Sequence, residues 1–336
     1  MGLLNRLFTP AADRERAARD AAAADPAIDR LVAATDHRLA YVADYRKVLR
    51  GPVIAARAQI AEAIARIPGP VDVGARSWSL DPTVRALFAS GDEAVRCFSG
   101  DPGMRAFLEA HPAGDGYGML GLLMNERRVI ASAMQGDMVQ ADVARTTMSF
   151  SEAQILAPCA DAAGVRSELV MRALEYLALR ALERVGAQRA QKRELEGERA
   201  LLNAQLRLAQ RKGAGFGAIS PVEGEGGTPG KAALERDLER VVAELEKSAS
   251  RSLLPVLVEE LVDVLQRWQP HLSIEPCTVA LDSMNFLVTP GPEHPELGAA
   301  VLTLARRGPF AVVIARFPRA ELRAPENRFA EAAKFL

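Results

Sequence analysis

Three cysteines, Cys97, Cys159 and Cys277, are the residues of this chain best suited to nucleophilic catalysis. They stand far apart, and no pair has the spacing of a zinc site or of a redox motif. Cys159 follows Pro158 at an expected helix start, where a thiolate is favoured, but no histidine partner is recognisable nearby. A structural role for all three is therefore the better interpretation.

The four histidines lie in unrelated parts of the sequence. None has a second histidine, a cysteine or a carboxylate at the helical spacing of a metal site, apart from Asp36 beside His37. We expect surface or turn positions for His37, His111, His271 and His294. The sequence thus predicts no catalytic residue and no metal site.

Two glycine-rich strings invite comparison with nucleotide-binding loops. GAGFG begins at Gly213, but a predicted helix precedes it where a dinucleotide loop requires a strand. GGTPGK ends at Lys231, but Glu225 stands at the required first glycine of a phosphate-binding loop, and Ala232 replaces the serine or threonine that holds magnesium. We therefore predict no cofactor.

Two apolar groups are candidates for binding a partner. The first is a one-turn patch near the N-terminus, which folds back onto the protein's own helices or docks on a partner or a membrane surface. The second is a pair of large residues in the glycine-rich segment 213–230, where a hook for a partner and disorder without function are equal alternatives. The residues are Leu3, Leu4, Leu7 and Phe8 in the patch, and Phe216 and Ile219 in the pair.

Composition limits the class of protein. With 49% apolar and 25% charged residues the chain is an ordinary globular mixture, and a formal charge of -1 gives no global field for nucleic acid or anionic membranes. No secretory signal and no apolar stretch of about 18 residues is apparent. We expect a cytoplasmic bacterial protein without a transmembrane segment.

The N-terminal 164 residues are expected to be mainly helical. Asp25-Pro26, Asp81-Pro82 and Asp101-Pro102 each mark a helix start, because the aspartate can cap and proline fits the first turn. Residues 1–68 form a helical region, in which Gly51-Pro52 ends one helix and a further helix follows. Residues 80–164 form a mainly helical globular domain, with a buried helix over 117–124 and a capping box at Ser151. Strands are an alternative over 129–150.

Residues 165–269 predict a helical arm. Apolar or small residues recur every seven positions across a stretch without proline, which is typical of a long coiled-coil-like helix. A second heptad pattern over 232–247 supplies an antiparallel partner, and the intervening segment 213–230 is read as a flexible tip. The recurring positions are Leu174, Ala181, Gln188, Leu195, Leu202 and Ala209, and then Leu234, Leu238, Val241 and Leu245.

After residue 269 apolar residues recur at every second position, the spacing that is typical of β-strands. Residues 270–320 predict a small antiparallel β unit of four strands, and 321–336 a C-terminal tail. The fold class is α+β and predominantly helical, with a helical N-terminal region, a long antiparallel helical hairpin and this small sheet.

These features favour a non-enzymatic scaffold or adaptor that binds a protein partner, or a second copy, through the arm. The alternative is a nucleic-acid-associated protein, because residues 186–212 hold seven basic and three acidic side chains and residues 306–328 are rich in arginine. Its weakness is the lack of aromatic residues among the basic ones. A third interpretation, an enzyme whose site joins residues distant in sequence, stays open.

Overall fold

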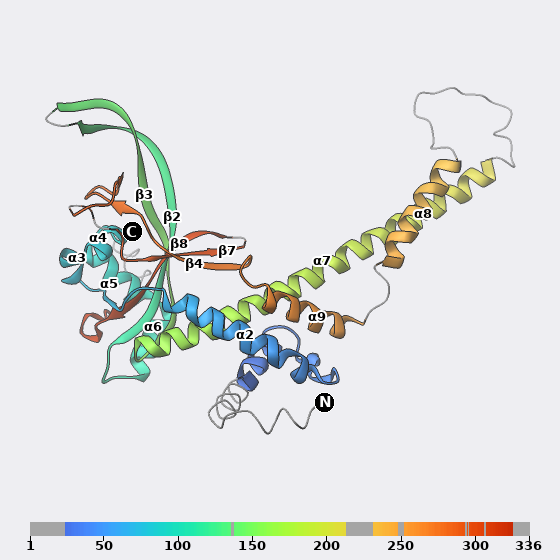
Figure 1. The fold of residues 1–336 in the computed structure, drawn as a ribbon, viewed down its shortest axis with the longest axis horizontal. Helices are drawn as coiled ribbons and strands as arrows, with labels where there is room; N and C mark the ends of the chain where they lie inside the picture. The colour runs from blue at the N-terminus through green and yellow to red at the C-terminus, as the bar shows by residue number, and fades with distance from the viewer. Residues whose placement is uncertain are drawn as a thin grey trace, which may run out of the picture. The chain divides into compact units, whose positions relative to one another are not determined.

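The computed structural model describes residues 24–135, 138–212, 231–247, 252–292, 294, 296–305 and 307–324. The chain combines helices with an antiparallel sheet and includes one long helix, α7 (Ala162–Lys212), as the sequence predicts (Figure 1). It forms two compact units. Unit 1 comprises Met1–Arg30, Arg50–Leu177 and Leu265–Leu336, and unit 2 comprises Leu31–Leu49 and Ala178–Val264.

The N-terminal helices depart from the predicted boundaries. Residues 24–34 are helical, so Asp25 lies inside this helix, and its carboxylate accepts a hydrogen bond from Arg50 at 2.8 Å. After η1 (His37–Tyr41), helix α2 (Tyr45–Ala65) continues through Gly51-Pro52, where the sequence predicts a stop. Leu49 and Val53 on either side are fully buried, and this packing outweighs the local preference of proline.

Four short helices follow: α3 (Ser77–Leu80), α4 (Pro82–Leu87), α5 (Gly91–Gly100) and α6 (Pro102–Ala110). The Asp81 carboxylate accepts from the Thr83 and Val84 amides, and Asp101 accepts from the Met104 amide. Both aspartate-proline pairs therefore begin helices as predicted.

Residues 116–159 are strands, and the prediction of a mainly helical domain over 80–164 is wrong for this part. β2 (Gly116–Gln135) pairs antiparallel with β3 (Met138–Cys159), so 117–124 is no helix and Ser151 caps none. The strands predicted as the alternative over 129–150 belong to this long hairpin. Residues Gly118–Leu122 are all buried, which removes the alternation typical of a strand with one covered face.

β3 is bulged at three places along the hairpin. The pairing register shifts between Tyr117 and Met119, between Gly121 and Leu123, and between Ala131 and Ala133. Near each shift β3 has one residue with positive φ: Ala157 at 56°, Glu152 at 51° and Asp142 at 63°. Because a bulge bends a strand and increases its twist, the hairpin curves along its length (Figure 1).

The C-terminal strands join this hairpin in one six-stranded sheet and do not form a separate small unit. The order is β3-β2-β8-β7-β4, with β8 (Arg307–Phe317), β7 (Ala300–Leu304) and β4 (Leu272–Pro276), and β1 (Val71–Asp72) pairs parallel with β8. Eight residue pairs link β2 to β8, from Gly116–Phe317 to Leu123–Phe310. This long-range pairing could not be read from a local pattern.

Helices α4, α5 and α6 cover one face of the sheet. Their apolar side chains pack with Leu120 and Leu122 of β2 and with Val313 and Phe317 of β8. Phe98 of α5 stacks on Phe317, with ring centroids 5.2 Å apart. These side chains form one apolar core of unit 1.

A small hairpin, β5 (Ala280–Leu281) with β6 (Leu287–Val288), braces the outer edge of β3. The Met148 amide donates to the Asn285 carbonyl at 2.8 Å, and the Thr147 hydroxyl donates to the same carbonyl at 3.2 Å. β4 pairs with β7 and not with this hairpin.

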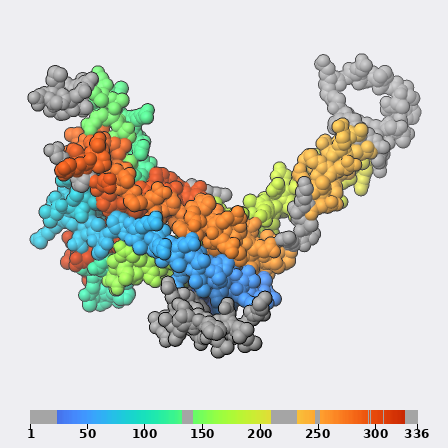
Figure 2. Space-filling model, viewed as in Figure 1, coloured from blue at the N-terminus to red at the C-terminus, as the bar shows by residue number. Residues whose placement is uncertain are grey.

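In unit 2 two helices lie along α7. Helix α8 (Lys231–Lys247) lies against α7 (Figure 2). The contact is a cluster around Leu202, Leu234 and Val241. From α9 (Leu253–Gln266), Asp263 accepts from Arg184 at 2.8 Å and Glu260 accepts from Gln188 at 2.8 Å.

Candidate partner-binding surfaces

The three thiols are poor nucleophiles in this fold. Burial, followed by the nearby carboxylates of Asp101 and Glu93, raises the pKa of Cys97 to about 11. Burial also raises the pKa of Cys159 and of Cys277. Cys159 ends strand β3 and lies just ahead of α7. A protonated thiol neither attacks nor binds metal readily, so these raised pKa values disfavour a nucleophilic role for the three thiols.

The histidines are also poor candidates for catalysis or metal binding. His111 is exposed, its Nδ1 lies 3.0 Å from the Phe107 carbonyl, and its ring stacks on Phe107. Within the described ranges no three histidine, cysteine, aspartate or glutamate side chains gather as metal ligands would.

One polar hollow of about 210 Å³ brings together residues that the sequence analysis did not combine. It is lined by Asp282, Ser283, His294 and Glu296, among others. The Asp282 carboxylate is already engaged by the Met284 and Phe286 amides and by Arg145. These bonds stabilise the β5–β6 turn, so the Asp282 carboxylate has a structural role.

An exposed apolar face lies on the part of α7 that extends into unit 2. We call residues 178–212 and 231–247 the arm. Leu195, Leu202 and Leu206 of the arm pack toward α8, whereas Leu201 and Leu208 keep 59% and 58% of their surface exposed. The two exposed leucines are seven residues apart, so they lie on one face of the helix. Leu195 and Leu202 are heptad positions named in the sequence analysis, whereas the exposed pair Leu201 and Leu208 was not predicted.

Charged side chains order the packed side of the arm. Arg240 of α8 donates to the Glu198 carboxylate at 2.9 Å and also pairs with Glu244. One guanidinium therefore makes both contacts. The contact with Glu198 joins α8 to α7, and the contact with Glu244 lies within α8. Exposed pairs of this kind contribute only about 0.2–1 kcal/mol each, so the leucine cluster supplies most of the stabilisation.

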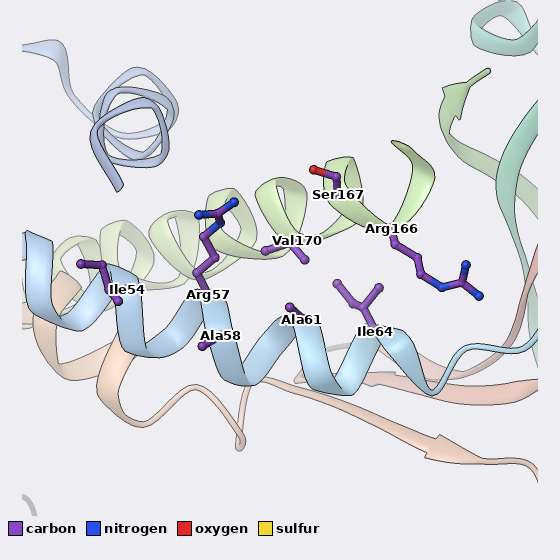
Figure 3. A pocket seen from close by; sticks show the side chains of 8 residues that line it. All are labelled: Ile54, Arg57, Ala58, Ala61, Ile64, Arg166, Ser167 and Val170. Carbon is purple, nitrogen blue, oxygen red and sulfur yellow. The ribbon is translucent and has the colours of Figure 1, made fainter. Parts of the chain in front are cut away.

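A groove between α2 and the start of α7 is the second candidate surface. It encloses about 350 Å³, and its lining is mostly apolar or small (Figure 3). The Arg57 side chain points from α2 toward α7, and Arg166 of α7 lies at the end of the groove, beyond Ile64 (Figure 3). The other lining residues are Ile54, Ala58, Ala61, Ser167 and Val170.

The six partner-binding residues predicted from sequence lie outside the described residues. Leu3, Leu4, Leu7 and Phe8 precede residue 24, and Phe216 and Ile219 fall between 212 and 231. Their roles stay predictions.

Comparison with known proteins gives no independent indication of function. No protein-family model matches the chain, and neither a curated protein nor a solved structure is detectably similar to it. Among the helices of the described part, none has the length and apolar character needed to cross a membrane.

Proposed function

We propose that the protein is a non-enzymatic cytoplasmic scaffold or adaptor that acts through protein–protein contacts of the arm. The observation that carries the proposal is the pair of exposed leucines, Leu201 and Leu208, one heptad apart on α7. In this proposal α7 and α8 form a coiled-coil-like hairpin, and the two leucines receive a further helix.

The energy available on this face suits a specific but modest contact. Full burial of a leucine contributes about 1.5–3 kcal/mol, so two leucines that are each more than half exposed offer about 2–4 kcal/mol. A second copy presents the same two side chains, and a symmetric contact would bury four leucines and double this contribution. Self-association is therefore one way to cover the face, and a partner helix with its own apolar stripe is the other.

The contacts of the C-terminal arginines give little support to the alternative of nucleic-acid binding. Arg316 pairs with Asp72 and Asp115, and Arg323 pairs with Asp92. Arg319 donates to the Leu108 carbonyl. These arginines of the basic C-terminal region are occupied by the fold, which leaves them less able to neutralise phosphates.

The proposal is tested with the double variant Leu201→Ser, Leu208→Ser. Leu80→Ser is the matched control, because Leu80 is also exposed but belongs to α3 of unit 1 and not to the arm. We expect the arm variant to abolish concentration-dependent self-association in sedimentation, or the capture of a stoichiometric protein at physiological salt. The melting transition should stay within a degree or two of the parent.

Three other outcomes would point elsewhere. Capture that persists in the double variant contradicts the proposal. Loss of capture only with Phe216→Ser and Ile219→Ser would move the contact to the segment 213–230. A nuclease-sensitive eluate whose yield falls steeply with salt would favour the nucleic-acid alternative.

A further inference from the structure

The α2–α7 groove has an apolar floor and two guanidinium groups with no acidic partner in the part of the chain that the structure describes. Among the described residues no carboxylate pairs with Arg57, and Arg166 donates only to the carbonyls of Ile67 and Gly69, at 3.2 and 3.4 Å. Ala58, Ala61 and Ser167 are exposed, although they stand between Ile64 and Val170, which are buried. A floor of small side chains lets another helix approach closely.

The chain that precedes residue 24 starts beside this groove. Asp25 bonds to Arg50 of α2 at 2.8 Å, and Arg50 lies one helical turn before Ile54, the first lining residue. On the other wall Arg30 donates to Glu168 at 2.8 Å and to Glu175 at 2.5 Å, next to the lining residue Ser167. Helix 24–34 therefore contacts both helices that form the groove.

We propose that the segment 1–23 of the same chain occupies this groove. Leu3, Leu4, Leu7 and Phe8 recur at the spacing of one helical face and match the apolar floor. The same segment carries the carboxylates of Asp13, Glu15 and Asp20 together with four arginines, so the proposal rests on the apolar face and on the place where the segment begins, not on net charge. The proposal concerns a site separate from the leucine face of the arm.

The length of the segment is sufficient. From Arg50 to Ile64 the axis of α2 rises about 21 Å at 1.5 Å per residue. The fifteen residues between Phe8 and Ala24 reach up to about 50 Å when extended. Because the segment is tethered beside the groove, its effective concentration is on the order of millimolar, so even a weak contact is populated.

Disulfide trapping tests the proposal. In a chain with Cys97, Cys159 and Cys277 replaced by alanine, Phe8→Cys is combined with Ala61→Cys in the groove. The matched control is Phe8→Cys with Ala55→Cys, because Ala55 is exposed on α2 but does not line the groove. We expect an intrachain disulfide to form at least tenfold faster with position 61, at a rate independent of protein concentration. Leu4→Ser with Leu7→Ser should reduce that rate to the control value.

Equal rates at positions 55 and 61 would overturn the proposal. Bonds that form only between chains would overturn it as well, since the occupant would then be a second copy. If the cysteine-free chain does not fold, a photoreactive benzoylphenylalanine at position 8 of the natural chain replaces the disulfide. Cross-links confined to residues 54–64 and 166–170 support the proposal, and cross-links elsewhere contradict it.

Discussion

Replacing Asp282 by alanine should weaken the attachment of the β5–β6 hairpin to β3. One carboxylate oxygen accepts from the Met284 amide at 2.9 Å and from the Phe286 amide at 3.0 Å, and the other accepts from Arg145 at 2.9 Å. The Arg145 guanidinium also lies 4.0 Å from the centre of the Phe286 ring. The substitution therefore removes the turn's acceptor and leaves a half-buried arginine without its carboxylate.

The size of the effect follows from these contacts. A hydrogen bond to a charged group contributes about 1.5–3 kcal/mol, and discounting for partial exposure and shared geometry gives about 2–3 kcal/mol for the three together. For a unit of this size each kcal/mol lowers the melting temperature by about 2–4 °C. We expect Asp282→Ala to melt roughly 4–12 °C below the parent.

Two further variants separate the turn from the ion pair. Asp282→Asn keeps an oxygen for the two amides but loses the charge, and Arg145→Met keeps the stem but loses the guanidinium. Each should cost about 1 kcal/mol, and the double variant should cost less than the sum, by about 0.5–1 kcal/mol. Chemical denaturation measures all three, and a cost below about 0.5 kcal/mol for Asp282→Ala would refute the reasoning.

The same site gives a pH dependence with a defined sign. Burial raises the pKa of Asp282, but the Phe286 and Met284 amides and Arg145 outweigh burial and hold that pKa below its usual value. The stabilisation is therefore complete above the unfolded-state pKa of about 3.9 and is lost as the pH falls through the lower folded-state value. In Asp282→Asn the free energy of unfolding should therefore fall less as the pH is lowered below about 4.

Three other predictions concern the core of unit 1. Gly69→Ala should unfold or strongly destabilise the protein, measured by thermal melting, because an added Cβ would overlap the Ile314 carbonyl and φ is 113°. Phe98→Ala should cost about 3–5 kcal/mol in denaturant titration, since it leaves a cavity against Phe317. Cys97 should react with iodoacetamide at pH 8 more than tenfold more slowly than in the denatured chain, because its pKa is about 11.

The sequence predicted elements whose signals are local. The caps at Asp81 and Asp101 lie where the aspartate-proline pairs indicate, and α7 and α8 lie where apolar residues recur at helical spacing. Strands β7 and β8 fall within the predicted β unit 270–320 and pair antiparallel. In each case the residues that fix the element are neighbours along the chain.

Strand β2 was missed because both of its faces are covered. Met119, Leu120 and Leu122 are buried without alternation, and methionine and leucine also favour helices. One sequence signal was present, the alternating glycines Gly116 and Gly118. In the structure a Cβ at Gly116 would overlap Met104, and one at Gly118 would come within 2.9 Å of Ile155. Alternating glycines in an apolar run indicate a strand that a neighbour approaches closely.

The candidate sites were only partly predictable. Leu195 and Leu202 of the packed cluster occupy heptad positions that the sequence analysis named. The exposure of Leu201 and Leu208 depends on which face of α7 is covered by α8. The groove joins α2 to α7 across more than a hundred residues, so no motif could reveal it.

Sedimentation of the parent and of the Leu201→Ser, Leu208→Ser variant, with and without partners captured at physiological salt, tests the central claim most directly. The account predicts an assembly that the variant abolishes while Leu80→Ser leaves it intact. An assembly that survives in the variant, or that Leu80→Ser disrupts equally, would contradict the account.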